Sequence, residues 1–172
     1  MASEMSFASP PEDRWFEDYV EGEVHEFGSI AVEEAEVLAF GRRFDPQVFH
    51  TDPVAAAATE YGGLIASGWH TAGLMMRLYA DHYLSHVATL VSPGVDELRW
   101  LLPVRPGDAL SIRVTVEEAR RSRSRPDRGI VRSGVAVLNQ RGEPVLTVTA
   151  RNFILRRPAA SAGEDVTERS SM

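Results

Sequence analysis

Asp45 and His50 are the residues of this chain whose types and spacing suit proton transfer. They stand five positions apart, among the apolar side chains of Phe44, Val48 and Phe49. Loops are normally solvated, so these apolar neighbours predict that this segment packs against the protein and that its ionisable groups are partly desolvated. Burial tends to raise the pKa of an aspartate, which then stays ionised only with a partner, while histidine titrates nearest neutrality. Such a pair can take a proton from water and give one to carbon.

The same two residues also have a purely structural interpretation. Asp45 precedes Pro46 and would cap a turn there, and His50 would be a histidine with satisfied hydrogen bonds. Ionisable groups in perturbed surroundings often have such explanations. The spacing alone favours the structural interpretation, so the catalytic one depends on other features of the chain.

A second candidate feature is the pair Ser67 and Gly68, within the run 63–70. We expect it at the start of a buried helix, where exposed backbone N–H groups and the helix dipole stabilise negative charge on an oxygen. Gly68 would leave such amides accessible, and the oxygen of a thioester carbonyl that develops enolate character suits them. In the structural alternative, Ser67 is the helix N-cap and Gly68 is a packing contact.

The elements that position these residues are predicted as a short strand and several helices. An extended stretch at 24–30 precedes apolar residues at helical spacing over 32–44. This helix should end near residue 44, because a residue before proline is disfavoured in helical conformation. The loop that follows is short, since Asp52 and Pro53 have the types of an N-cap and a first helical residue. The longest helix is predicted over 64–86, and it should be buried because it is apolar on most sides.

From Val95 onward the hydrophobic period changes to two, which predicts an antiparallel meander. Strand-like runs cover 111–117, 131–138 and 145–155, separated by turns rich in Pro, Gly, Asp and Asn. One long apolar helix followed by such a sheet indicates an α+β fold in which the sheet wraps the helix.

Composition limits the class of protein. The chain has 172 residues, 44% hydrophobic and 25% charged, and a net charge of -7. These values predict one soluble domain over 14–157 with flexible segments at 1–13 and 158–172, and they disfavour binding to nucleic acid. There is no cysteine and no lysine, so thiolate, disulfide and Schiff-base chemistry are excluded. No run reaches the roughly 18 apolar residues of a membrane span, and no export signal is visible, so we expect a cytoplasmic protein.

His82 and His86 could bind a metal ion as an i, i+4 pair on the long helix. A zinc site needs at least a third protein ligand, and none is evident nearby. We therefore predict no metal site.

Three features follow one another along the chain in a distinctive order. They are the pair Asp45 and His50, then Ser67-Gly68, then the turn 103–108 (Pro-Val-Arg-Pro-Gly-Asp). With this order the chain resembles the MaoC-like dehydratase family, the (R)-specific enoyl-CoA hydratases with a hot-dog fold. The similarity covers 16–155, nearly the whole predicted domain.

The resemblance implies that Asp45 and His50 are catalytic residues that hold and activate water, which adds reversibly across the double bond of a 2-enoyl thioester. It implies that the Gly68 amide receives the thioester oxygen and that Ser67 and Trp69 border the substrate pocket. The substrate would be an acyl-CoA or acyl-carrier-protein thioester, as in fatty acid metabolism, with no cofactor or metal. The assembly would be a homodimer or a dimer of dimers. Many hydratases have a histidine where this chain has Ser67, which leaves the substrate range open.

Two alternatives remain on the same fold. An acyl-CoA thioesterase of this type usually carries its acid on the central helix, and 64–79 contains none. A non-catalytic acyl-CoA-binding protein is the third possibility, because fold alone does not define function. The arginine-rich run 120–128 is interpreted as a solvated hairpin tip, with a modest role in meeting coenzyme A phosphates across a dimer as the alternative.

Overall fold

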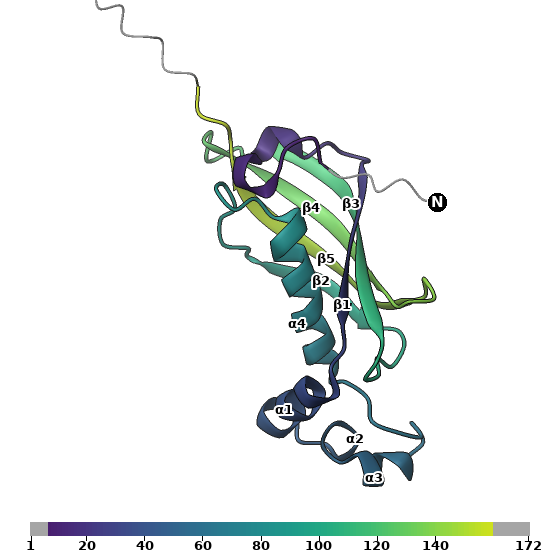
Figure 1. The fold of residues 1–172 in the computed structure, drawn as a ribbon. Coiled ribbons are helices and arrows are strands. Elements are labelled where there is room, and N and C mark those ends of the chain that lie inside the picture. The colour runs from purple at the N-terminus through teal and green to yellow at the C-terminus, as the bar shows by residue number, and fades with distance from the viewer. Residues whose placement is uncertain (1–6, 160–172) are drawn as a thin grey trace, which may run out of the picture.

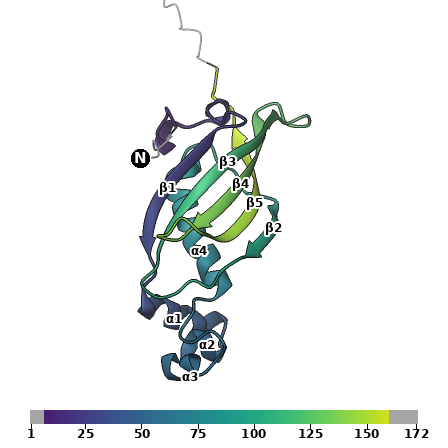
Figure 2. The same cartoon turned by 90° about the vertical axis from the view of Figure 1, so that its right-hand side faces the viewer.

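A computed structural model describes residues 7–159. In this part of the chain five antiparallel strands form one curved sheet, in the order β1-β3-β4-β5-β2. The sheet curls around helix α4 (Figures 1 and 2). This is the α+β arrangement that the change of period predicted. The strands are β1 (Val24–Ala31), β2 (Gly94–Trp100), β3 (Ala109–Arg121), β4 (Arg128–Leu138) and β5 (Pro144–Leu155).

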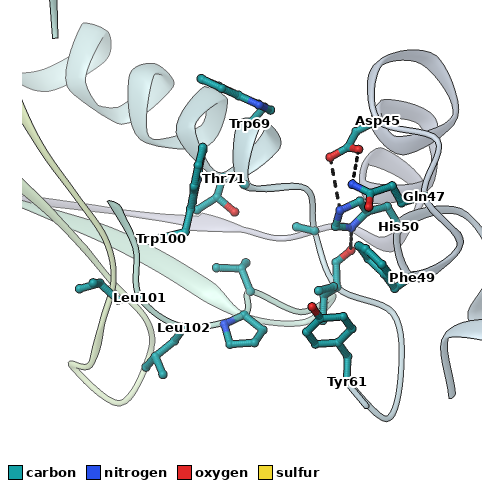
Figure 3. A pocket seen from close by; sticks show the side chains of 15 residues that line it. Asp45, Gln47, Phe49, His50, Tyr61, Trp69, Thr71, Trp100, Leu101 and Leu102 are labelled. Carbon is teal, nitrogen blue, oxygen red and sulfur yellow. Dashed lines mark hydrogen bonds and ion pairs between the residues drawn. The ribbon is translucent and has the colours of Figure 1, made fainter. Parts of the chain in front are cut away.

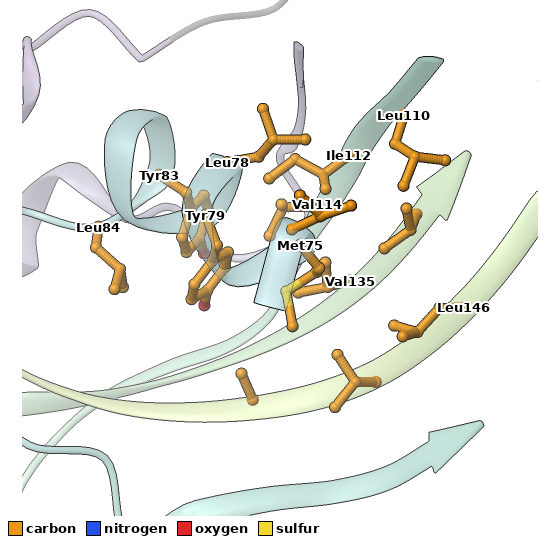
Figure 4. Close-up of a cluster of buried hydrophobic side chains, with 14 of the residues drawn as sticks. Met75, Leu78, Tyr79, Tyr83, Leu84, Leu110, Ile112, Val114, Val135 and Leu146 are labelled. Carbon is orange, nitrogen blue, oxygen red and sulfur yellow. The ribbon is translucent and has the colours of Figure 1, made fainter. Parts of the chain in front are cut away.

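The core lies between the concave face of the sheet and α4 (Gly68–Leu78). In β3 the apolar residues at every second position, from Leu110 to Val116, are buried, as the period of two requires. From the helix, Met75, Leu78 and Tyr79 extend into the same cluster (Figure 4). The helix is therefore fixed along its length, and its first turn is held in place relative to the sheet.

The predicted helix over 64–86 is shorter in the structure, and this prediction was wrong at both ends. Residues 64–67 are not helical because their backbone groups bond elsewhere: Ile65 N–H donates to the Phe49 carbonyl at 3.0 Å, and Ala66 N–H to the Val104 carbonyl at 2.8 Å. At the other end a π-helical turn, Tyr79–Tyr83, follows α4. The helix thus begins at Gly68, with Ser67 as its N-cap.

Three short helices lie together at one end of the molecule (Figure 1). They are α1 (Glu34–Phe44), α2 (Val48–Thr51) and α3 (Pro53–Ala57). The predicted end of α1 at residue 44 is confirmed. Asp52 caps α3 as predicted, since its carboxylate accepts hydrogen bonds from Val54 N–H at 2.9 Å and Ala55 N–H at 3.0 Å. The segment 45–52 was predicted as a loop, but it contains the single helical turn α2.

The segment before β1 packs across the end of the sheet. Phe7 lies in the core, although the predicted domain begins at residue 14. Arg14 is buried, and its guanidinium donates to the carbonyls of His82 at 2.7 Å and Tyr83 at 2.8 Å, where the π-helical turn ends. The domain limits of 14–157 stay a prediction. The position of Phe7 in the core shows that the chain already packs before residue 14. No helix in residues 7–159 is both long enough and apolar enough to span a membrane.

Candidate active site

Asp45 and His50 come together at the junction of α1 and α2. Asp45 is the C-cap of α1, where Pro46 prevents the helix from continuing. Gln47 is the N-cap of α2, and the single turn of α2 brings His50 back toward the end of α1. The Asp45 Oδ2 and His50 Nε2 atoms lie 3.3 Å apart (Figure 3). The structure therefore brings the predicted pair into contact.

The orientation of the His50 ring is fixed by a backbone carbonyl. Its Nδ1 lies 2.8 Å from the carbonyl oxygen of Ile65, and the residue is only 4% exposed. A carbonyl only accepts hydrogen bonds, so Nδ1 carries a proton and donates it. In the neutral ring Nε2 is then an acceptor, and this is the nitrogen that faces Asp45.

The Asp45 carboxylate is held by two further hydrogen bonds. Gln47 Nε2 donates to Oδ1 at 2.8 Å, and Ser67 Oγ donates to Oδ2 at 2.7 Å. The hydrogen bond from Gln47, then that from Ser67, and the nearby His50 lower the pKa of Asp45 and outweigh the opposing effect of burial. Burial acts to raise this pKa, as expected, but the carboxylate is only half-buried and has the partners that keep it ionised. Asp45 is therefore ionised at neutral pH.

Beside the pair lies a cavity of about 430 Å³. Asp45, Gln47 and His50 lie together at one end, Thr71 and Tyr61 lie elsewhere in the lining, and the other walls are mainly apolar and aromatic (Figure 3). The walls come from α2, the start of α4 and the segment that follows β2. The lining residues are Asp45, Gln47, Phe49, His50, Tyr61, Ile65, Ala66, Gly68, Trp69, Thr71, Trp100, Leu101, Leu102, Pro103 and Val104. A mostly apolar cavity with a few polar groups at one end is typical of a small-molecule site.

The other predicted site residues lie at the start of α4. Gly68 and Trp69 line the cavity. Within the described part of the chain no group accepts a hydrogen bond from the Gly68 N–H. Trp69 is 62% exposed, and its ring meets that of Trp100 edge to face. Ser67 is buried and does not line the cavity; it caps α4 by accepting a hydrogen bond from Trp69 N–H at 3.3 Å. Its hydroxyl thus joins the helix start to Asp45.

Among the residues that the sequence analysis missed, Gln47 and Gly41 act directly on the pair. Gln47 lines the cavity and holds the second oxygen of Asp45. Gly41, in α1, lies directly against His50: a Cβ at this position would be 2.5 Å from the His50 carbonyl oxygen. The signal for Gly41 was available, since a glycine inside a helix costs about 1 kcal/mol relative to alanine and often marks a close approach.

The structure does not support the metal pair. Within residues 7–159 no group of three or more metal-ligating side chains occurs. His82 stacks on Phe27 with ring centroids 5.5 Å apart, and His86 Nδ1 lies 3.3 Å from a Glu12 carboxylate oxygen. Each histidine therefore has a packing or ion-pair role of its own.

Replacing Ser67 by alanine is expected to shift the acid limb of the pH–activity profile to higher pH. Ser67 Oγ stabilises the ionised form of Asp45, so its loss raises the pKa of that carboxyl, and the ionised form is lost at a higher pH. The variant also loses an N-cap, which costs about 1 kcal/mol of stability. The measurement is kcat/KM as a function of pH. D52A is the matched control, because it removes the cap of α3 at similar cost and should leave the acid limb unmoved.

Replacing Gly41 by alanine is expected to destabilise the protein by about 1–3 kcal/mol and to lower kcat. The new Cβ would meet the backbone of His50, including its carbonyl oxygen, and a backbone cannot rotate away as a side chain can. Urea unfolding measures the stability change, and initial rates measure the change in kcat. A G41A protein as stable and as active as the wild type would show that the His50 turn adjusts freely.

The comparisons with known proteins agree with this fold. A curved antiparallel sheet that wraps one helix is a hot-dog fold. The chain belongs to the family with a MaoC-like domain, whose model matches residues 17–138. Family membership supports a hydratase or dehydratase activity in general.

Several relatives are similar over most of their length. A MaoC-like dehydratase from Rhodospirillum rubrum is 43% identical, with a TM-score of 0.78, and the match covers 85% of this chain and 99% of that one. An (R)-hydratase from A. caviae involved in PHA biosynthesis is 26% identical, with a TM-score of 0.60, over 81% of this chain and 97% of that one. The protein YdeM from Bacillus subtilis (strain 168) is 25% identical over 125 residues, which is 73% of this chain and 87% of that protein.

Proposed function

We propose that this protein catalyses the reversible addition of water to a 2-enoyl thioester carried by coenzyme A or an acyl carrier protein. The observation that carries this proposal is the contact between Asp45 Oδ2 and His50 Nε2, 3.3 Å apart, at one end of a mainly apolar cavity. An apolar cavity suits an acyl chain, and the polar end suits the water that adds to it.

The pair has the hydrogen-bonding character needed to bind water. His50 Nε2 and the Asp45 carboxylate are both acceptors, because Nδ1 of His50 carries the ring proton. A water molecule next to both can donate one O–H to each, which orients its oxygen lone pair away from the pair and into the cavity. This orientation aims the oxygen at the β-carbon of a bound enoyl group.

The proton then passes through the histidine. As the C–O bond forms at the β-carbon, one O–H bond of water breaks and its proton moves to His50 Nε2. Asp45 stays ionised, because its pKa is lowered by its hydrogen bonds, and it stabilises the imidazolium that results. The imidazolium returns the proton to the α-carbon, a C–H bond forms, and the pair regains its starting state. Elimination of water is the same sequence in reverse.

Between these two transfers negative charge rests on the thioester oxygen. Gly68 lines the cavity at the first turn of α4, an 11-residue helix whose dipole places positive charge at this end. A backbone amide in that position can donate a hydrogen bond to the oxygen as the enolate develops. The predicted roles of Gly68 and of the pair are thus parts of one proposal.

The alternatives require chemistry that the site is less suited to. A thioesterase needs a carboxylate aimed at the carbonyl carbon, and α4 contains no acidic residue. A binding protein needs no ionised acid in contact with a histidine, and burying such a pair has a cost that binding does not repay. We also propose a homodimer, since β2 is an edge strand of the sheet and its exposed Val95 lies outside the cavity.

Crotonyl-CoA incubated with the purified protein tests the proposal. Hydration removes the conjugated double bond, which is followed by ultraviolet absorbance, and yields 3-hydroxybutyryl-CoA. Release of free thiol, measured with a thiol reagent, would instead identify a thioesterase. Binding without either product would identify a non-catalytic protein.

A further inference from the structure

Arg105 is not itself a lining residue of the cavity, but its side chain is hydrogen-bonded to one. It follows Val104, which lines the cavity, and its Nη2 donates a hydrogen bond to the carbonyl oxygen of Tyr61 at 2.6 Å. The Tyr61 side chain also lines the cavity. A guanidinium has five N–H donors in a rigid plane, so this bond fixes its position and leaves other donors exposed.

Arg105 differs from most exposed arginines of the chain in having no acidic partner. Arg113 pairs with Glu26 and Arg132 pairs with Glu117, for example, on the outer face of the sheet. Within residues 7–159 no carboxylate lies within ion-pair distance of the Arg105 guanidinium. The neighbouring Asp108 accepts a hydrogen bond from the backbone N–H of Arg105, at 2.8 Å. Arg105 is thus a cation without an acidic partner that is bonded to a lining residue of the cavity, in a protein with a net charge of -7.

The position of Arg105 separates it from the proposed chemistry. The ring centroids of His50 and Phe49 lie 4.6 Å apart, and those of Phe49 and Tyr61 lie 5.0 Å apart, so the Phe49 ring stands between His50 and Tyr61. Arg105 is bonded to the backbone of Tyr61, and its side chain is exposed. An exposed cation in this position is accessible to the part of a thioester substrate that extends from the cavity into solvent.

We propose that Arg105 binds the phosphate of the phosphopantetheine arm by which the acyl group is carried. This inference rests on the function proposed above and adds a binding site to it. A planar guanidinium matches the oxygens of a phosphate with two parallel hydrogen bonds, and phosphate is the anion that occurs on this arm in both coenzyme A and acyl carrier proteins. Arg42 and Arg43 of α1 and the hairpin arginines 121, 123 and 125 also lack an acidic partner among the described residues. Unlike Arg105, none of them donates a side-chain hydrogen bond to a residue that lines the cavity.

Three crotonyl thioesters that differ only in the carrier test this proposal. They are crotonyl-CoA, crotonyl-phosphopantetheine and crotonyl-pantetheine, and only the last lacks phosphate. For R105Q we expect KM to rise about tenfold with the first two substrates, since a hydrogen bond between charged groups is lost, while kcat is unchanged. With crotonyl-pantetheine R105Q should behave as the wild type does. R105K should show a smaller rise in KM than R105Q, because lysine keeps the positive charge but lacks the planar guanidinium with its parallel N–H donors.

The controls separate a binding role from a structural one. R141Q makes the same charge change in a turn away from the cavity, where Arg141 pairs with Glu143, and should leave all three KM values unchanged. An equal rise in KM for R105Q with all three substrates would overturn the proposal and show that Arg105 only holds the Tyr61 loop. A rise in KM with crotonyl-CoA alone would also overturn it, since the nucleotide part of coenzyme A would then be the ligand of Arg105. An effect of R123Q in place of R105Q would assign the phosphate to the hairpin instead.

Binding without an acyl group keeps this test independent of catalysis. By calorimetry, wild-type protein should bind phosphopantetheine more tightly than pantetheine, and R105Q should bind the two equally. If the protein does not hydrate crotonyl-CoA but still binds phosphopantetheine more tightly than pantetheine, the proposed function is contradicted and the Arg105 site remains supported. A crotonyl carrier protein identifies the source of the phosphate: a lower KM than that of crotonyl-CoA indicates the carrier protein, and a higher one indicates coenzyme A.

Discussion

Replacing Asp45 by asparagine is expected to lower kcat for hydration of crotonyl-CoA by about 10²–10⁴, the usual contribution of a positioned acid or base. Asparagine has nearly the same shape, so the cavity keeps its volume and KM should change little. The amide lacks the negative charge that stabilises protonated His50, and it accepts fewer hydrogen bonds from Ser67 and Gln47. Initial rates at saturating substrate measure the effect. A D45N protein with more than a tenth of the wild-type kcat would contradict the proposed role.

The same variant has a signature in stability that distinguishes lost chemistry from lost folding. The pKa of Asp45 is lowered in the folded state, so its ionised form contributes stability above the unfolded pKa, and this contribution is lost as the pH falls through the folded pKa. Asparagine does not titrate. The difference in unfolding free energy between wild type and D45N should therefore shrink as the solution is acidified toward the folded pKa. Urea unfolding at several pH values measures it.

His50 provides a second test of the pair. If the two side chains act on the same water molecule, H50Q should also lose most of kcat, and the double variant D45N/H50Q should lose little more than either single variant. Independent structural roles would instead give losses that multiply. Glutamine has no donor at the position of His50 Nδ1, so H50N, whose amide nitrogen stands at that position and can still donate to the Ile65 carbonyl, is the control for the turn of α2.

Much of this site could be predicted from the sequence because its main determinants are local. The proline after Asp45 ends α1, and Asp52 and Pro53 begin α3, so both ends of the segment that carries His50 were placed correctly. The period of two in the second half likewise predicted the sheet. These signals depend only on neighbouring residues and on backbone geometry.

The parts that could not be predicted depend on contacts between distant segments. Residues 64–67 have a sequence compatible with helix, but Ile65 and Ala66 donate their backbone N–H groups to Phe49 and Val104, so the helix begins four residues later. Ser67 could be identified as an N-cap, but its bond to Asp45 joins residues 22 positions apart. Tertiary hydrogen bonds of this kind override local propensity and leave no periodic trace in the sequence.

Replacing Gly68 by alanine should lower kcat/KM by about 100-fold, the scale of loss expected when reacting groups are displaced by about 1 Å. A Cβ at Gly68 would lie 2.5 Å from Cε2 and Nε1 of the Trp100 indole. Trp100 is half-exposed at the end of β2, so it can turn away, and the fold should tolerate the change. Its new position would alter the cavity wall next to the proposed oxyanion donor.

Gly73 offers a matched control in the same helix. A Cβ at Gly73 would meet nothing within 4 Å. G73A should therefore keep its activity and gain up to about 1 kcal/mol of stability, since alanine favours the helix over glycine. Because G68A makes the same chemical change five residues earlier, the difference in kcat/KM between the two variants isolates the contact with Trp100 and the access to the Gly68 amide. Equal activity of the two would mean that the thioester oxygen does not depend on the start of α4, and the oxyanion donor would have to be sought elsewhere along the cavity.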